Sequence, residues 1–145
     1  MKKFLIAALA AAGLAGPAAA QEQPKTLVTI LTAPEPQTQL MAMVLAMQSA
    51  QQGVDPHVLL CGPAGDLALK DAPEAATAPQ PPMGMSPQGL MAKIVGMPGA
   101  KVEVCALYLP GMDADASVLM DGVTVAKPPA MAAAMIAPDA RVASY

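Results

Sequence analysis

Short apolar segments alternate along the chain with longer segments whose apolar residues recur at helical spacing. The short segments are continuous runs rich in Val, Ile and Leu, which is typical of strands buried on both faces of a parallel sheet. Such alternation predicts helices that cover both faces of that sheet. We therefore expect a three-layer α/β/α sandwich with a mostly parallel sheet of about five strands. The predicted strands are 26–32, 57–61, 101–107, 123–125 and 141–144, and the main helices are 37–52, 88–97 and 128–136.

Turn and capping residues separate these elements. Gly53 follows the first helix, and Ser86 followed by Pro87 resembles an N-cap with proline at the first helical position. Residues 72–87 hold five of the sixteen prolines and are predicted to form an irregular, Pro-rich flap. Further helical turns are expected over 64–70 and 113–120. The apolar spacing that predicts the first helix is carried by Leu40, Met41, Val44, Leu45 and Met47.

The N-terminus has the features of a secretory signal peptide. Two lysines directly after Met1 precede an uncharged run over 4–16, and Pro-Ala-Ala-Ala then leads to Gln21. A membrane anchor is the alternative, but a spanning helix needs about 20 apolar residues, and this run is shorter. We expect cleavage after residue 20, no membrane span afterwards, and, from the alanine-rich style of the leader, a periplasmic protein. The sequence thus predicts a signal peptide over 1–20 and one domain over 21–145.

Charge and composition narrow the function. Removing residues 1–20 takes away two of the eight Lys and Arg and none of the eleven Asp and Glu, which leaves a formal charge of −5. No basic cluster follows the leader, so nucleic-acid binding is not expected. Aromatic residues are nearly absent, and eleven of the twelve methionines remain after cleavage, so the core must be built from aliphatic residues and Met.

Two cysteines are the main candidates for chemistry. Cys61 ends the second predicted strand and Cys105 lies near the end of the third, at the sheet edge where parallel α/β proteins bind ligands. Three interpretations stay open: buried structural thiols, a disulfide favoured by an oxidising compartment, and a reactive or persulfide-carrying thiol. The strand order discriminates between them. Neighbouring strands, about 5 Å apart, permit a bridge, whereas an intervening strand forbids one.

Several segments resemble the DsrE/DsrF-like family. They are the run 101–105 (KVEVC) after a glycine, then 121–125 (DGVTV), the start of a late helix at 129–132 (PAMA), and 57–62 (HVLLCG) after an amphipathic helix. The resemblance covers nearly all of the mature chain in the right element order. It implies a small, flavodoxin-like α/β fold, a homo-oligomer, and sulfur carried as a persulfide on Cys105.

The same resemblance implies a sulfur donor or acceptor protein as partner. Beside it, Cys61 is the candidate partner or resolving thiol. Family sequences often place a basic loop after the cysteine, whereas the loop 106–111 here has no positive charge, so loop amides alone would stabilise a thiolate. The expected function is a periplasmic thiol protein that handles sulfur as a carrier, with at most sulfurtransferase-like activity and no cofactor.

A structural or binding module, with copper as one ligand, is the alternative function. Thioethers suit Cu(I), and Met83 and Met85 lie in the flap, where core packing does not explain them. The single histidine, His57, starts a strand at the opposite end from the cysteines and is expected to be structural or on the surface. With a single histidine, the usual catalytic triads and His-rich zinc sites are not expected. A phosphate-binding loop is not expected either, because residues 62–65 lack its Lys and its Ser or Thr.

Overall fold

The computed structural model describes residues 23–145, so the predicted signal peptide lies outside the described residues. Five strands form one sheet in the order β4-β3-β2-β1-β5, and every neighbouring pair is parallel. The predicted α/β class, strand number and parallel pairing are confirmed. The strands are β1 (Thr26–Leu31), β2 (Asp55–Leu60), β3 (Lys101–Val104), β4 (Thr124–Val125) and β5 (Ala140–Ser144).

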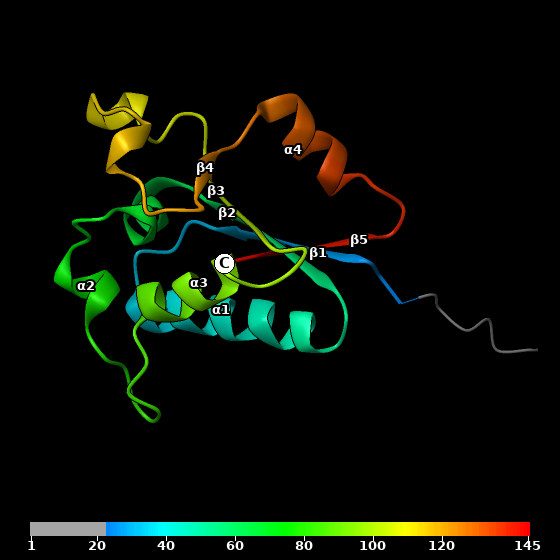
Figure 1. The fold of residues 1–145 in the computed structure, drawn as a ribbon, viewed down its shortest axis with the longest axis horizontal. Coiled ribbons are helices and arrows are strands. Elements are labelled where there is room, and N and C mark those ends of the chain that lie inside the picture. Colours follow the sequence, from blue (N-terminus) through cyan, green and yellow to red (C-terminus); the bar gives the residue numbers. More distant parts are fainter. Residues whose placement is uncertain (1–22) are drawn as a thin grey trace, which may run out of the picture.

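Helices cover both faces of the sheet, which makes the predicted three-layer sandwich. Figure 1 shows α1 and α3 together on one face and α4 on the other. None of the helices within residues 23–145 is long and apolar enough to cross a membrane. The helices are α1 (Pro36–Gln51), α2 (Glu74–Thr77), α3 (Pro87–Val95) and α4 (Pro128–Met135), with 3₁₀ turns η1 (Gly62–Ala68), η2 (Pro110–Met112) and η3 (Ala116–Val118).

The ends of α1 and α3 follow from local chemistry. Pro36 occupies the first turn of α1, where its missing N–H costs nothing, and Gly53 after the helix has φ of +80°, which favours glycine. Ser86 caps α3, because its Oγ accepts a hydrogen bond from the Gly89 N–H at 3.0 Å. The capping residues predicted from the sequence are therefore the ones that the structure uses.

The face of α1 that packs on the sheet differs from the prediction. The residues buried there are Gln39, Ala42, Met43 and Ala46. The apolar residues from which the helix was predicted lie elsewhere. Leu40, Val44 and Met47 are directed toward the flap and α3, and Met41 and Leu45 are exposed to solvent. The close approach of α1 to the sheet needs small side chains, and alanine carries little weight in an apolar pattern. α1 consequently has a second apolar side that the sheet does not cover.

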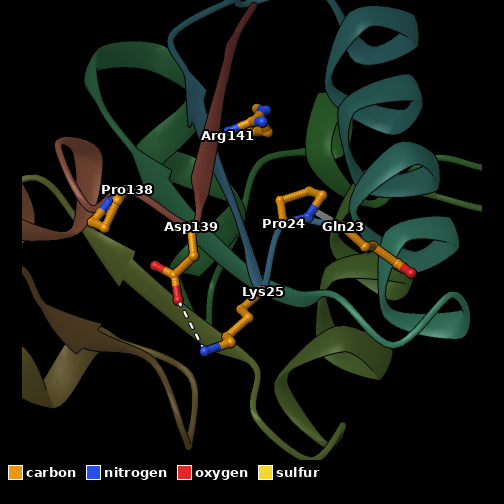
Figure 2. Close-up of a pocket in the computed structure, with 6 residues that line it drawn as sticks. All are labelled: Gln23, Pro24, Lys25, Pro138, Asp139 and Arg141. Atoms are coloured by element: carbon orange, nitrogen blue, oxygen red, sulfur yellow. Dashed lines mark ion pairs between the residues drawn. The ribbon is translucent and has the colours of Figure 1, made fainter. Parts of the chain in front are cut away.

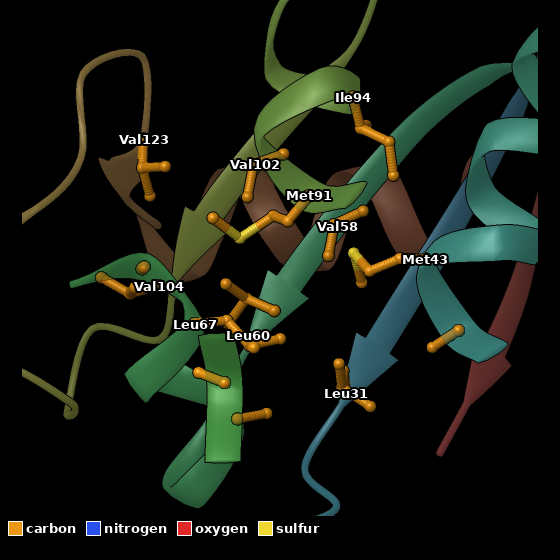
Figure 3. Packing of buried hydrophobic residues seen from close by; sticks show 14 of the residues in the cluster. Leu31, Met43, Val58, Leu60, Leu67, Met91, Ile94, Val102, Val104 and Val123 are labelled. Carbon is orange, nitrogen blue, oxygen red and sulfur yellow. The ribbon is translucent and has the colours of Figure 1, made fainter. Parts of the chain in front are cut away.

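Two hydrophobic clusters lie on the two faces of the sheet. The larger one fills the space between the sheet and α1, α3 and η1, and Figure 3 shows Met43, Met91 and Leu60 meeting in it. The smaller one lies under α4, around Val28 and Met131. Aliphatic residues and Met therefore supply almost all of the core, as the composition requires.

The start of β2, the end of β3 and the flap differ from the sequence prediction, and the other strands and main helices begin and end within two residues of their predicted bounds. β2 starts at Asp55 rather than His57, and Pro56 is paired inside the strand. β3 ends at Val104 rather than at residue 107, because the chain turns after Cys105, where the Tyr108 N–H donates to the Cys105 carbonyl at 2.9 Å. The Pro-rich flap, expected to lack regular structure, contains the single helical turn α2.

Candidate functional site

Cys61 and Cys105 lie next to each other at the carboxyl edge of the sheet. β2 and β3 are neighbours, with Leu60 opposite Val104, and each cysteine follows directly after this pair. The Cys105 N–H donates to the Leu60 carbonyl at 2.8 Å, which extends the ladder to the cysteines. The strand order is thus the one that permits a disulfide. In this structure both residues are free, half-buried thiols.

The thiol of Cys61 resists losing its proton. Its pKa is raised from 9.0 to about 12, mainly by burial and in smaller part by the neighbouring Cys105. A buried thiol resists ionisation because the thiolate loses its hydration, and a second thiolate beside the first would repel it. Cys61 is therefore a thiol at neutral pH.

Tyr108 and Asp66 join the loops that carry the two cysteines. Tyr108 belongs to the turn after Cys105, and its hydroxyl donates to Oδ1 of Asp66 in η1 at 2.6 Å. Burial, followed by this bond to the carboxylate, raises the pKa of Tyr108. The ring lies against Gly65, where a Cβ atom would collide with it. Sequence reasoning did not identify these residues, because neither stands in a recognisable motif.

Cys105 lines two hollows that lie on either side of it. One, of about 400 Å³, is bounded by Leu59, Leu107, Met131 and other apolar residues of the loop and α4. The other, of about 510 Å³, lies over the start of η1 and includes Tyr108. The sulfur of Cys105 therefore sits at the rim of a parallel sheet and is not sealed in the interior. Leu107, the residue two positions on, is 79% exposed.

His57 is buried away from the cysteines and pairs with a carboxylate. Its Nε2 lies 2.6 Å from Oε2 of Glu103 on the neighbouring strand, and Thr124 donates to the other carboxylate oxygen at 3.4 Å. These residues come from β2, β3 and β4, and β4 is an edge strand of the sheet. His57 is thus buried and paired rather than on the surface. Glu103 was not identified from the sequence, although its position within an apolar strand was a signal for a buried partner.

The methionines of the flap lie in a groove next to α1. Met83 and Met85 line it together with Met41 and Met47, while Met43 is buried against the sheet. The Nζ of Lys93 lies 3.9 Å from the sulfur of Met85. Within residues 23–145, no group of three or more His, Cys, Asp or Glu side chains is arranged to hold a metal ion.

A further hollow of about 540 Å³ opens at the other end of the sheet. Figure 2 shows its lining, with Lys25 and Asp139 joined by an ion pair of 3.5 Å and Arg141 farther along β5. Both partners of the pair are exposed to solvent. The hollow lies where β1 and β5 begin, opposite the carboxyl edge at which parallel sheets bind ligands, and it contains neither a nucleophile nor a buried polar group.

Comparison with solved structures identifies the fold. The YchN protein from E. coli superposes with a TM-score of 0.65, at 17% sequence identity, over 85% of this chain and 100% of that one. The fold is YchN-like. A second neighbour, MTH1491 from Methanobacterium thermoautotrophicum, described as a protein of unknown function, gives a TM-score of 0.58 at 11% identity, over 83% of this chain and 97% of that one. No family model and no curated protein matches the sequence.

These similarities support a DsrE/YchN-like fold, in agreement with the resemblance noted in the sequence. Identities this low establish the fold alone, because unrelated functions share α/β folds of this kind. What the YchN-like chain does must therefore be argued from its own site. The cysteine pair at the carboxyl edge of the sheet is the group of residues best placed for chemistry.

Proposed function

We propose that this protein is an exported thiol protein of the DsrE type that carries sulfur as a persulfide on Cys105, with Cys61 as its partner thiol. The observation that carries the proposal is the adjacency of the two cysteines at the carboxyl edge of the sheet, where Cys105 borders two hollows. Export rests on the signal-peptide features of residues 1–20. The partners are a sulfur donor and a sulfur acceptor, and further copies of this chain.

Loading Cys105 requires a donor persulfide, R–S–SH. The Cys105 thiolate attacks the outer sulfur of the donor, a new S–S bond forms, the donor S–S bond breaks, and R–S⁻ leaves. An acceptor thiolate then attacks the outer sulfur of the Cys105 persulfide in the same way, and Cys105 leaves as a thiolate. Neither step changes the number of sulfur–sulfur bonds, so the carrier needs no oxidant and no cofactor.

Cys61 also provides a way to discharge the sulfur without an acceptor. Its thiolate attacks the Cys105 sulfur that bears the outer atom, HS⁻ leaves, and a Cys61–Cys105 disulfide forms. The outer sulfur is reduced to sulfide and the sulfur of Cys61 is oxidised by the same two electrons, while the sulfur of Cys105 exchanges one S–S bond for another. This reaction needs the Cys61 thiolate, which a pKa of about 12 makes scarce at neutral pH. The raised pKa therefore keeps the sulfur on Cys105 long enough for transfer to an acceptor.

Mass spectrometry after exposure to polysulfide tests the proposal. The protein is purified without reductant, its free thiols are counted, and it is then treated with polysulfide and capped by alkylation. We expect wild type and Cys61→Ser to gain one sulfur atom on Cys105, which dithiothreitol removes. Cys105→Ser, the matched control, gains none at this site. In the wild type the added sulfur is slowly lost as sulfide while a Cys61–Cys105 disulfide forms, and this loss quickens as pH rises.

Two results would contradict the carrier role. If Cys105 never gains sulfur although both thiols are still found free when they are counted, the pair is structural. If Cys105→Ser gains as much sulfur as Cys61→Ser, the carrier cysteine is wrongly assigned. Protein that already lacks free thiols when purified contains the disulfide, and the same polysulfide experiment is then run after reduction.

Copper binding through Met83 and Met85 is the alternative function. Four thioethers along one groove favour a soft metal ion, since Cu(I) prefers such ligands. The ammonium group of Lys93 beside Met85 opposes it, because a bound cation would be repelled. The geometry therefore favours sulfur handling. Competition between the protein and a Cu(I) chelator measures the alternative, with Met83→Leu and Met85→Leu as isosteric controls.

A further inference from the structure

The groove beside α1 is the largest apolar feature that the proposed function does not use. α1 contributes Leu40, Val44 and Met47 to one wall, the flap contributes Pro81 and its neighbours to another, and α3 completes the lining. Its volume of about 590 Å³ falls in the range of about 300–1,000 Å³ that is typical of small-molecule sites. The groove is thus bounded by three segments and large enough for a ligand.

The groove explains why α1 has two apolar sides. One side, with Ala42 and Met43, packs on the sheet, and the other, with Leu40 and Val44, is only half covered. A helix that is apolar on more than one side is normally covered on each of them. Exposed Met41 extends the uncovered side toward solvent. The second apolar side therefore has the apolar composition that is typical of one side of a ligand-binding groove.

The tip of the flap, which lines the groove beside this wall, is closed into a turn by its own hydrogen bonds. The Gln80 N–H donates to the Met85 carbonyl at 2.9 Å, and the Gly84 N–H donates to the Gln80 carbonyl at 2.9 Å. Gly84 has φ of +65°, which lets the chain reverse there. This closed turn carries Met83, 82% exposed, at its tip. Figure 1 shows the turn projecting from the carboxyl side of the sheet next to α1. Flexible thioether side chains in such a turn adapt to ligands of different shape.

One positive charge distinguishes the groove from a simple apolar surface. Lys93 on α3 is the only ionisable residue among the lining side chains, and within residues 23–145 it forms no ion pair. Its sole polar contact is the sulfur of Met85. The amides of Gln37, Gln48 and Gln80 complete the polar part of the lining. An uncompensated ammonium group beside a long apolar wall complements a ligand with a carboxylate at one end and a hydrocarbon chain behind it.

We propose that this groove binds an anionic amphiphile of the fatty-acid class, with its chain along α1 under the flap and its carboxylate at Lys93. The site is separate from the cysteines, which lie on other segments at the edge of β2 and β3. The proposal therefore stands whether or not Cys105 carries sulfur.

Fluorescence with parinaric acid, a fatty acid that becomes bright in apolar surroundings, measures the binding. Dodecanoate, below its micelle concentration, is expected to displace the probe from the purified protein with one site per chain. Dodecanol, which has the same chain without the charge, is expected to bind up to roughly fivefold more weakly, because it cannot form the ion pair with the exposed Lys93. Lys93→Gln removes this preference for the acid. Lys127→Gln, a matched change on the opposite face of the sheet, leaves it intact.

A second variant tests the apolar wall independently. Val44→Glu places a carboxylate in the groove and is expected to weaken dodecanoate binding at least tenfold, while urea unfolding shows that the chain remains folded. Equal binding of dodecanoate and dodecanol, or a preference for the acid that survives in Lys93→Gln, would overturn the proposal. Failure of dodecanoate to displace the probe would also overturn the proposal. This holds whether Cu(I) binds the methionines instead or sedimentation shows that a second copy of the chain covers the groove.

Discussion

The pH dependence of cysteine alkylation tests the arrangement of the two thiols most directly. The structure raises the pKa of Cys61 from 9.0 to about 12, so its thiolate is up to about a thousandfold scarcer near pH 8 than that of an ordinary cysteine. Cys61 is half-buried, and access of solvent makes this factor an upper bound. In Cys105→Ser the neighbouring sulfur is gone and burial remains. The pKa of Cys61 should then fall but stay above 9.0.

The assay follows the rate of iodoacetamide labelling of Cys61 in Cys105→Ser from neutral pH to about pH 11, with urea-unfolded protein as reference. Restricted access alone lowers the rate at every pH and leaves the midpoint near 9.0, whereas a raised pKa moves the midpoint itself. We expect a shifted midpoint. A midpoint near 9.0 in the folded protein would refute the reasoning, and with it the explanation of why sulfur stays on Cys105.

The same shift links Cys61 to stability at high pH. The unfolded chain releases this proton as pH rises above 9.0, the ordinary pKa of a cysteine thiol, while the folded chain holds it to about 12. The folded state therefore binds more protons in this window, and stability falls as pH rises through it. The stabilisation that this proton on Cys61 contributes is fully present below 9.0, the pKa in the unfolded chain. Urea unfolding at successive pH values should show a steeper loss for wild type than for Cys61→Ala, and parallel curves would contradict the assignment.

Three further predictions concern residues that hold the fold, each measured by urea unfolding. Glu103→Ala leaves His57 without its partner and should cost about 1–3 kcal/mol; a loss near zero would show that the pair contributes nothing. Gly65→Ala forces a methyl group into the ring of Tyr108 and should cost about 1–3 kcal/mol, most of which disappears in a Tyr108→Ala background. Met91→Ala empties the centre of the larger cluster and should cost about 2–5 kcal/mol, unlike a surface methionine.

The sequence was sufficient to predict the architecture because most elements are determined by residues within or next to them. Apolar runs, Gly53 and Ser86 each determine a boundary through nearby residues alone. The prediction was wrong where a distant contact decides the outcome. β3 stops at Val104 because Tyr108 turns back to Cys105, and the sheet-facing side of α1 is set by close packing of alanines. Neither contact produces a periodic pattern of apolar residues that could be recognised in the sequence.

The site was predicted only in part, for a related reason. Both cysteines could be assigned to strand ends, but whether they touch depends on strand order, which the pattern does not encode. The link between Tyr108 and Asp66 spans two loops and was missed. Met83 and Met85 were identified as residues without a core role, yet the groove that explains them involves α1 as well. Sequence patterns thus indicate which residues are unusual, and tertiary contacts determine what they do together.

Among the residues that the structure describes, no Lys or Arg lines the hollows at Cys105, and this limits the kind of sulfur donor that such a carrier accepts. The hollow toward α4 is lined by apolar residues such as Leu59 and Met131, and the carboxylate of Asp66 in the other hollow is already bonded to Tyr108. A small dianion such as thiosulfate would find no counter-charge there, and its desolvation would go uncompensated. Exposed Leu107 beside the thiol instead provides an apolar contact. Loading should therefore be fast from a persulfide held in apolar surroundings, slow from thiosulfate, and nearly independent of ionic strength, because no long-range attraction guides the encounter.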